Sequence, residues 1–146
     1  MRVQESIEIN RPLKEVFDYA FNVENFPEWL GPAIEVHKDT PSQLRKGDRF
    51  TVSTKFLGHR YEQPFELTSN EPNRRYTHRA AGGPIPNQVW TYTFEEVSAG
   101  TRLTRIAEGE TRGFFKLAEP LIERAVERQF KNDLEMLKDI LEMQEA

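Results

Sequence analysis

The feature that most constrains this 146-residue chain is a long amphipathic segment near its C-terminal end. From Pro120 to about Met143, apolar residues recur at the spacing of one helix face. The helix would be about 35 Å long at 1.5 Å per residue, so its apolar stripe needs a large surface to pack against. The stripe consists of Ile122, Val126, Phe130, Leu134, Leu137 and Leu141, widened by Leu121 and Ala125.

The N-terminal part predicts one strand followed by two short helices. Residues 3–9 alternate between apolar and polar, as in a strand with one buried face. A short helix is predicted over 12–21, because proline suits its first position and apolar residues follow at helical spacing. Asn22 ends this helix and caps a second short one, which carries Trp29 and ends near Gly31.

Between residues 33 and 110 the apolar period changes from helical spacing to two, with short turns rich in Gly, Pro and Asn. This pattern predicts an antiparallel meander, and with the first strand it gives six or seven strands in all. Only such a sheet is large enough to cover the C-terminal helix. The predicted fold class is therefore α+β, a curved antiparallel sheet wrapped around the long C-terminal helix, in a single domain over residues 1–146.

Six short segments in this order resemble the helix-grip fold of the START-like, or SRPBCC, superfamily. Among its members, the chain is similar to the polyketide cyclase/dehydrase-like and lipid-transport-like families. The resemblance implies the fold more specifically than the chemistry, since one scaffold serves carriers, cyclases, hormone receptors and hydroxylase subunits. The segments are 9–17 (INRPLKEVF), 26–29 (FPEW), 47–50 (GDRF), 71–76 (EPNRRY), 100–104 (GTRLT) and 134–138 (LEMLK).

Composition excludes several classes of function. The net charge of −4 argues against nucleic acid or an anionic membrane as partner. The chain has no cysteine, and its three histidines fall on different predicted elements, so we expect no metal and no cofactor. It has no apolar run long enough to span a membrane and no signal-peptide pattern at its start, which favours a cytoplasmic protein. The oligomeric state stays open, with a homodimer among the options.

A curved sheet that grips one helix is expected to leave a wedge between the two, and sites of this kind are mostly apolar with a few polar groups. We therefore predict an internal site for a small hydrophobic or aromatic molecule. Its predicted lining residues are Trp29, Phe50, Phe56, Tyr61, Phe65, Tyr76, His78, Trp90, Tyr92, Phe94, Arg105, Phe114, Leu121 and Ile122.

Three of these residues have two interpretations each. His78 either points into the wedge, as a candidate acid or base, or lies at a sheet edge. Arg105 either faces outward and pairs with a carboxylate such as Glu95, or faces inward and needs an acidic ligand or an internal acid. Trp29 either gates the site or fixes the short helices to the sheet. The cluster of Arg74, Arg75 and Arg79 is interpreted as a solvated sheet surface.

Two functions follow from these expectations. The first is binding or transport of a lipid-like or polyketide-like ligand without bond chemistry. The second is a polyketide cyclase, dehydratase or aromatase in which Tyr, His and Arg side chains act in the same site. The second requires at least two of Tyr76, His78 and Arg105 to converge. A regulatory interaction domain is a third option without a sequence signature.

Overall fold

The computed structural model describes residues 1–56, 58–82, 87–110 and 114–143. Its strands are β1 (Arg2–Ile9), β2 (Ala33–Lys38), β3 (Arg49–Phe56), β4 (His59–Glu71), β5 (Arg75–Ala80), β6 (Val89–Val97) and β7 (Gly100–Glu108). Its helices are α1 (Leu13–Phe21), the 3-10 turn η1 (Val23–Asn25), α2 (Phe26–Trp29), α3 (Phe114–Leu117) and α4 (Glu119–Met143). The predicted order of strand, short helices, meander and long helix is confirmed.

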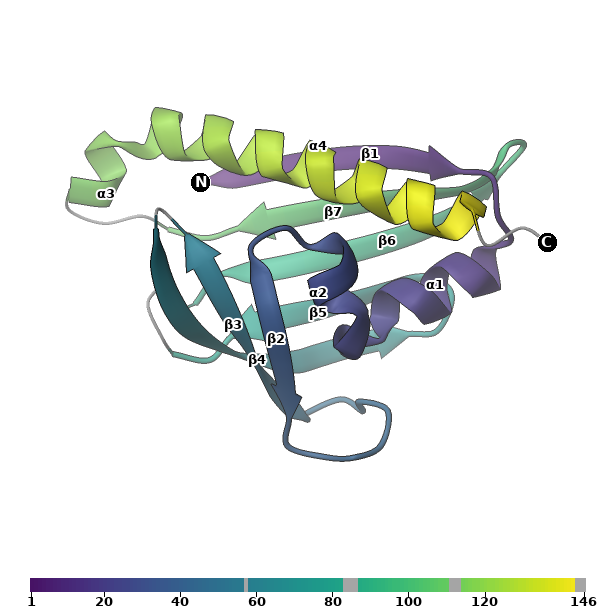
Figure 1. Cartoon of the computed structure of the whole chain (residues 1–146), viewed down its shortest axis with the longest axis horizontal. Coiled ribbons are helices and arrows are strands. Elements are labelled where there is room, and N and C mark those ends of the chain that lie inside the picture. The colour runs from purple at the N-terminus through teal and green to yellow at the C-terminus, as the bar shows by residue number, and fades with distance from the viewer. Residues whose placement is uncertain (57, 83–86, 111–113, 144–146) are drawn as a thin grey trace.

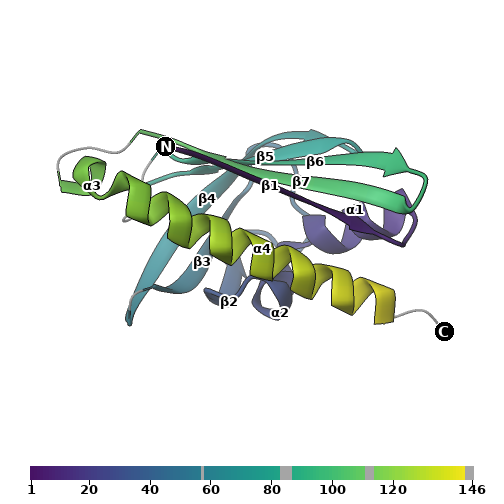
Figure 2. The same ribbon diagram turned by 90° about the horizontal axis from the view of Figure 1, so that it is seen from above.

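The strands that the structure describes form one antiparallel seven-stranded sheet in the order β1-β7-β6-β5-β4-β3-β2. Strands β2 to β7 follow one another as a meander, and β1 closes the other edge by pairing with β7. The sheet curves strongly, so that β2, β3 and β4 turn toward the side that carries the helices (Figures 1 and 2). The predicted α+β class and the upper strand count are both confirmed.

Helix α4 lies on the same side of the sheet as α1 and α2 (Figure 2). It runs beside β1 and contacts α2, which in turn contacts β2. The helix therefore covers the β1 edge of the inner face, while α1 contacts β6 and β7 and α2 contacts β2. None of the helices that the structure describes combines the length and apolar composition needed to cross a lipid bilayer.

Only the C-terminal two thirds of the α4 stripe is fully buried. Its buried apolar residues are Phe130, Leu134, Leu137 and Leu141, whereas Ile122 and Val126 are half-buried. Leu121 is 71% exposed, and Ala125 is exposed as well. The prediction that Leu121 lines the interior is therefore wrong. The physical reason is visible in Figure 1, where the start of α4 projects beyond the N-terminal end of β1.

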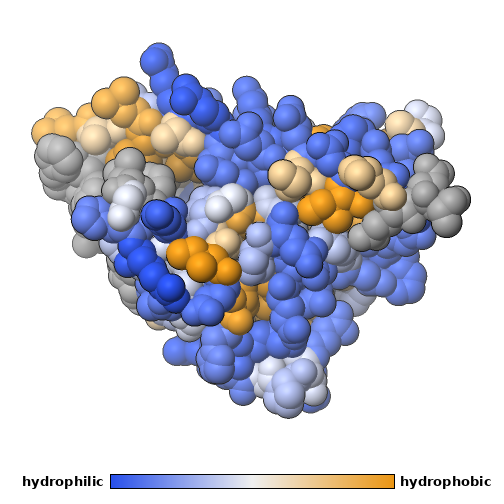
Figure 3. Space-filling view, in the orientation of Figure 1, coloured by the Kyte–Doolittle hydropathy of each residue, from blue (hydrophilic) through white to orange (hydrophobic). Residues whose placement is uncertain are grey.

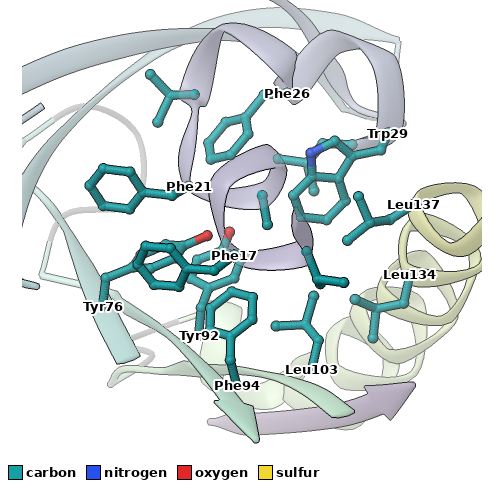
Figure 4. Packing of buried hydrophobic residues seen from close by; sticks show 14 of the residues in the cluster. Phe17, Phe21, Phe26, Trp29, Tyr76, Tyr92, Phe94, Leu103, Leu134 and Leu137 are labelled. Atoms are coloured by element: carbon teal, nitrogen blue, oxygen red, sulfur yellow. The ribbon is translucent and has the colours of Figure 1, made fainter. Parts of the chain in front are cut away.

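The short helices close the other part of the inner face. Helix α1 packs its buried residues on β6 and β7, and Phe17 contacts Phe94 with ring centroids 5.0 Å apart. Asn22 caps the following turn, because its side chain accepts a hydrogen bond from the backbone N–H of Glu24. Figure 4 shows the resulting core, with Trp29 of α2 facing Leu137 of α4. The prediction that Asn22 ends the first helix is confirmed, but Asn22 caps η1 and not α2, which begins after Asn25.

Two neighbouring residues of α4 test how this helix is docked. Leu137 is 0% exposed, so we expect Leu137→Ala to lower the free energy of unfolding by about 2–5 kcal/mol. Met136 is 49% exposed, and Met136→Ala should change it by less than about 0.5 kcal/mol. Urea unfolding of the two variants measures both values. Equal losses would contradict the docking of α4.

Candidate functional site

Three adjacent strands in the middle of the sheet place polar side chains on its inner face. Tyr76 of β5 lies opposite Tyr92 of β6, and Tyr92 lies opposite Arg105 of β7. His78 follows two residues after Tyr76, so strand alternation puts it on the same face. Strand β5 has a neighbour on both sides, so the interpretation of His78 as a sheet-edge residue is wrong. Tyr76, His78 and Arg105 thus all lie on the inner side, an arrangement that the cyclase hypothesis requires.

The aromatic rings of this face contact one another closely. The rings of Tyr76 and Tyr92 are stacked with centroids 4.6 Å apart. His78 lies 5.1 Å from Tyr76 and 5.5 Å from Tyr92. On its other side, His78 meets Phe50 of β3 at 4.9 Å and Phe26 of α2 at 6.0 Å. His78 is thus enclosed by rings from the sheet and from the short helices.

Arg105 points inward and pairs with an acid on α4. Its Nη1 lies 3.5 Å from Oδ2 of Asp133, and its Nε donates a 3.1 Å hydrogen bond to Oη of Tyr92. The guanidinium carbon lies 4.1 Å from the ring centroid of Phe130. The outward interpretation is wrong, because Glu95 pairs instead with Arg102 at 3.2 Å.

Asp133 connects three elements through one carboxylate. Its Oδ1 accepts hydrogen bonds from the backbone N–H of Gly31, at 2.9 Å, and from Nε2 of Gln129, at 2.7 Å. Its Oδ2 faces Arg105. Burial raises the pKa of Asp133, while Arg105 and both hydrogen bonds act in the opposite direction. The internal acid that an inward Arg105 requires is therefore present within the chain.

Three buried polar atoms beside this pair have no hydrogen-bond partner among the residues that the structure describes. They are Nε1 of Trp29, Oη of Tyr76 and Nε2 of His78, on side chains that are each at most 2% exposed. Trp29 lies on the far side of Arg105, with its ring centroid 6.0 Å from the guanidinium carbon. Buried polar groups are nearly always hydrogen-bonded, because each unpaired one costs about 1–3 kcal/mol. Three such atoms on the inner face therefore mark it as a candidate site.

Burial keeps these groups uncharged over most of the pH range. It lowers the pKa of His78 to about 3, and the positive charge of Arg105 contributes in the same direction. Burial also raises the pKa of Tyr76 well above its ordinary value, and it raises that of Tyr92. The face thus offers neutral hydrogen-bonding groups at neutral pH.

The structure brings most of the predicted lining residues together. Trp29 is buried against Phe26, with ring centroids 5.8 Å apart, which favours its role in fixing the short helices. Tyr61 is half-buried near the β3–β4 turn, where its ring meets that of His59. The side chains of Phe56 and Phe114 lie outside the part of the chain described. The residues joined in one network of ring and hydrogen-bond contacts are Trp29, Phe50, Phe65, Tyr76, His78, Trp90, Tyr92, Phe94 and Arg105.

Sequence reasoning missed Asp133, Phe26 and Phe130. Asp133 had a detectable signal, because it lies three residues after Phe130 and four before Leu137, on the apolar stripe of the helix. A charge at such a position needs an internal partner. Phe26 begins the 26–29 segment (FPEW), and no sequence pattern indicates that its ring contacts that of His78. No group of three His, Asp or Glu side chains suited to a metal occurs among the described residues.

The curved sheet, the docked C-terminal helix and the polar cluster between them define a helix-grip protein of the SRPBCC type. The chain belongs to the polyketide cyclase/dehydrase and lipid transport family, whose model matches residues 1–142. A search of curated proteins gives no match to its sequence.

Solved structures from several bacteria share the fold. TTHA0849 from Thermus thermophilus is 17% identical with a TM-score of 0.84, and the match covers 100% of each chain. NE0264 from Nitrosomonas europaea is 18% identical with a TM-score of 0.77, covering 100% of this chain and 97% of that one. The Aha1 dimer from Colwellia psychrerythraea is 15% identical with a TM-score of 0.70, covering 100% and 99%. At these identities the likeness concerns the fold alone.

The pKa of His78 gives a pH test of the site. Because its folded pKa of about 3 is below its ordinary value of 6.5, the unfolded chain binds the extra proton first as the pH falls. Stability should therefore decrease below about pH 6.5, by about 2 kcal/mol between pH 7 and pH 5 from this group. Urea unfolding of His78→Leu should lack that part of the decrease.

The matched control is His37→Leu, which removes an exposed histidine of β2. It should keep the full pH dependence of the unaltered protein. If His78→Leu and His37→Leu respond identically to pH, His78 is not buried as described.

Proposed function

We propose that the protein binds, and in that way transports, a small and largely apolar molecule against the inner face of its sheet. The observation that carries this proposal is the set of unpartnered polar atoms on Trp29, Tyr76 and His78, surrounded by aromatic rings. Ligand sites are typically apolar surfaces with a few polar groups that orient the guest. Family membership supports the same function, since it includes lipid transport proteins.

The electrostatics of the site favour binding over proton-transfer chemistry. A general acid or base works best when its pKa is near the working pH. The pKa of His78 lies at about 3, and that of Tyr76 lies well above its ordinary value. At neutral pH neither group exchanges a proton readily. Both are better suited to holding a polar group of a ligand by hydrogen bonds.

A polyketide cyclase, dehydratase or aromatase is the second candidate. The observation in its favour is the convergence of Tyr76, His78 and Arg105 on one side of the sheet. In this function, the side chains would fold a flexible chain and polarise a carbonyl. It requires a bound substrate to move the pKa of His78 toward neutrality, which a histidine NMR titration would detect.

A homodimer and a cytoplasmic location are also proposed. Leu117 is 85% exposed and Leu121 71% exposed, and together they form an apolar end of the molecule (Figure 3). Such a patch is a possible contact with a second copy. The cytoplasmic location rests on the absence of cysteine from the sequence.

Filling the site with a larger side chain tests the binding function. The neutral fluorescent probe N-phenyl-1-naphthylamine should bind the protein with a rise in its emission. His78→Trp places a large indole at the centre of the inner face and should abolish this rise. His37→Trp adds the same indole to an exposed position of β2 and should leave it unchanged. Far-UV circular dichroism confirms that both variants are folded.

Binding is also observable in the unaltered protein. The indole N–H of Trp29 has no partner, so its NMR resonance should shift on addition of the probe. Trp90→Phe identifies which of the two indole signals belongs to Trp29. Absence of binding, or binding that leaves both the Trp29 signal and the His78→Trp variant unaffected, would overturn the proposal.

A further inference from the structure

We infer that the polar group of the ligand is uncharged, a carbonyl or hydroxyl oxygen, and that the site discriminates against carboxylates. This inference rests on the proposed binding function and specifies its ligand class. The reason lies in the charges around the three unpartnered atoms. A single inward-facing arginine in an apolar site normally suggests an acidic ligand. In this protein the carboxylate of Asp133 takes the place of that acid.

The charge of Arg105 is compensated within the chain. Asp133 faces its Nη1 at 3.5 Å, and Tyr92 accepts from its Nε. The ring of Phe130 covers the guanidinium face at 4.1 Å. An anionic ligand would have to displace Asp133, whose carboxylate is also held by Gly31 and Gln129. That exchange would leave a second buried carboxylate uncompensated.

The next charges outward are balanced as well. Glu5 of β1 lies opposite Arg105 in the strand register, and its carboxylate lies 3.8 Å from Nζ of Lys131 on α4. These four charged groups, from β1, β7 and α4, thus form two neutral pairs. An additional anion or cation would enter a low-dielectric region without a counter-charge.

The unpartnered atoms are complementary to a neutral oxygen. Nε1 of Trp29 is only a donor, so it needs an acceptor. Oη of Tyr76 and Nε2 of His78 belong to neutral groups, because burial suppresses the charged form of each. A phenol donates to a carbonyl or a hydroxyl, and a neutral imidazole nitrogen donates to either when it carries the proton and otherwise accepts from a hydroxyl. Each of these atoms can therefore be satisfied by a neutral oxygen, without added charge.

Three naphthalene derivatives of similar size separate the possibilities. They are 2-naphthol, which is neutral at pH 7, 2-naphthoate, which is anionic, and 2-naphthylmethylamine, which is cationic. Isothermal titration calorimetry should show that the protein binds 2-naphthol about tenfold or more tightly than either charged probe, as expected when a buried charge lacks a partner. Unsubstituted naphthalene should bind more weakly than 2-naphthol.

Two reciprocal variants should invert this order. Asp133→Asn keeps the Oδ1 acceptor for Gly31 and leaves the Arg105 charge uncompensated, so 2-naphthoate should gain about tenfold over 2-naphthol. Arg105→Gln leaves Asp133 uncompensated, so 2-naphthylmethylamine should gain instead. Glu135→Gln removes the same charge as Asp133→Asn from an exposed position of α4 and should change nothing.

The outcomes separate this inference from the binding function. If none of the four probes binds the unaltered protein, the proposed function fails and the inference fails with it. If probes bind but 2-naphthoate equals or exceeds 2-naphthol, only the inference fails. It fails also if neither reciprocal variant, confirmed as folded by circular dichroism, alters the order of affinities. Because the two variants leave opposite charges, the loss of one to misfolding still leaves a decisive measurement.

Discussion

The buried ion pair between Arg105 and Asp133 is the interaction on which the arrangement of the interior depends. It joins β7 to α4, and the same carboxylate holds the backbone N–H of Gly31 in the turn after α2. Hydrophobic packing by itself is non-directional and would allow α4 to slide along β1. A pair with one partner on each element fixes the register between them. Removing either partner would cost about 3–5 kcal/mol, because the other charge would remain buried alone.

The same pair determines what the inner face can recognise. Arg105 is neutralised and covered, so the polar groups that remain on Trp29, Tyr76 and His78 are uncharged. Recognition at such a face depends on hydrogen bonds and on apolar contact. A buried group that is built to form a hydrogen bond rejects analogues that lack the matching atom more strongly than an apolar wall rejects an extra methylene. In the proposed function, selectivity would therefore follow from the unpaired atoms, and general affinity from the rings around them.

The periods of two and 3.6 in the sequence were sufficient to predict the meander, the short helices and the long C-terminal helix, because each depends on neighbours close in the chain. The inner face of β5 and β6 was predictable for the same reason. The environment of Arg105 was not, because its partner lies on another element and 28 residues away. Leu121 shows the opposite error, since it follows the helical pattern at a point where the sheet has already ended.

The polar features of the interior do not maximise the stability of the folded chain in the absence of a ligand. A buried ion pair is often no more stabilising than apolar residues of similar volume. Each unpartnered buried atom lowers stability by about 1–3 kcal/mol, whereas an apolar group of the same shape would not. A guest that hydrogen-bonds to these atoms in the folded state only would stabilise that state by mass action. The groups that weaken the fold are thus the groups able to couple folding to ligand binding, which is the physical argument for treating them as a site.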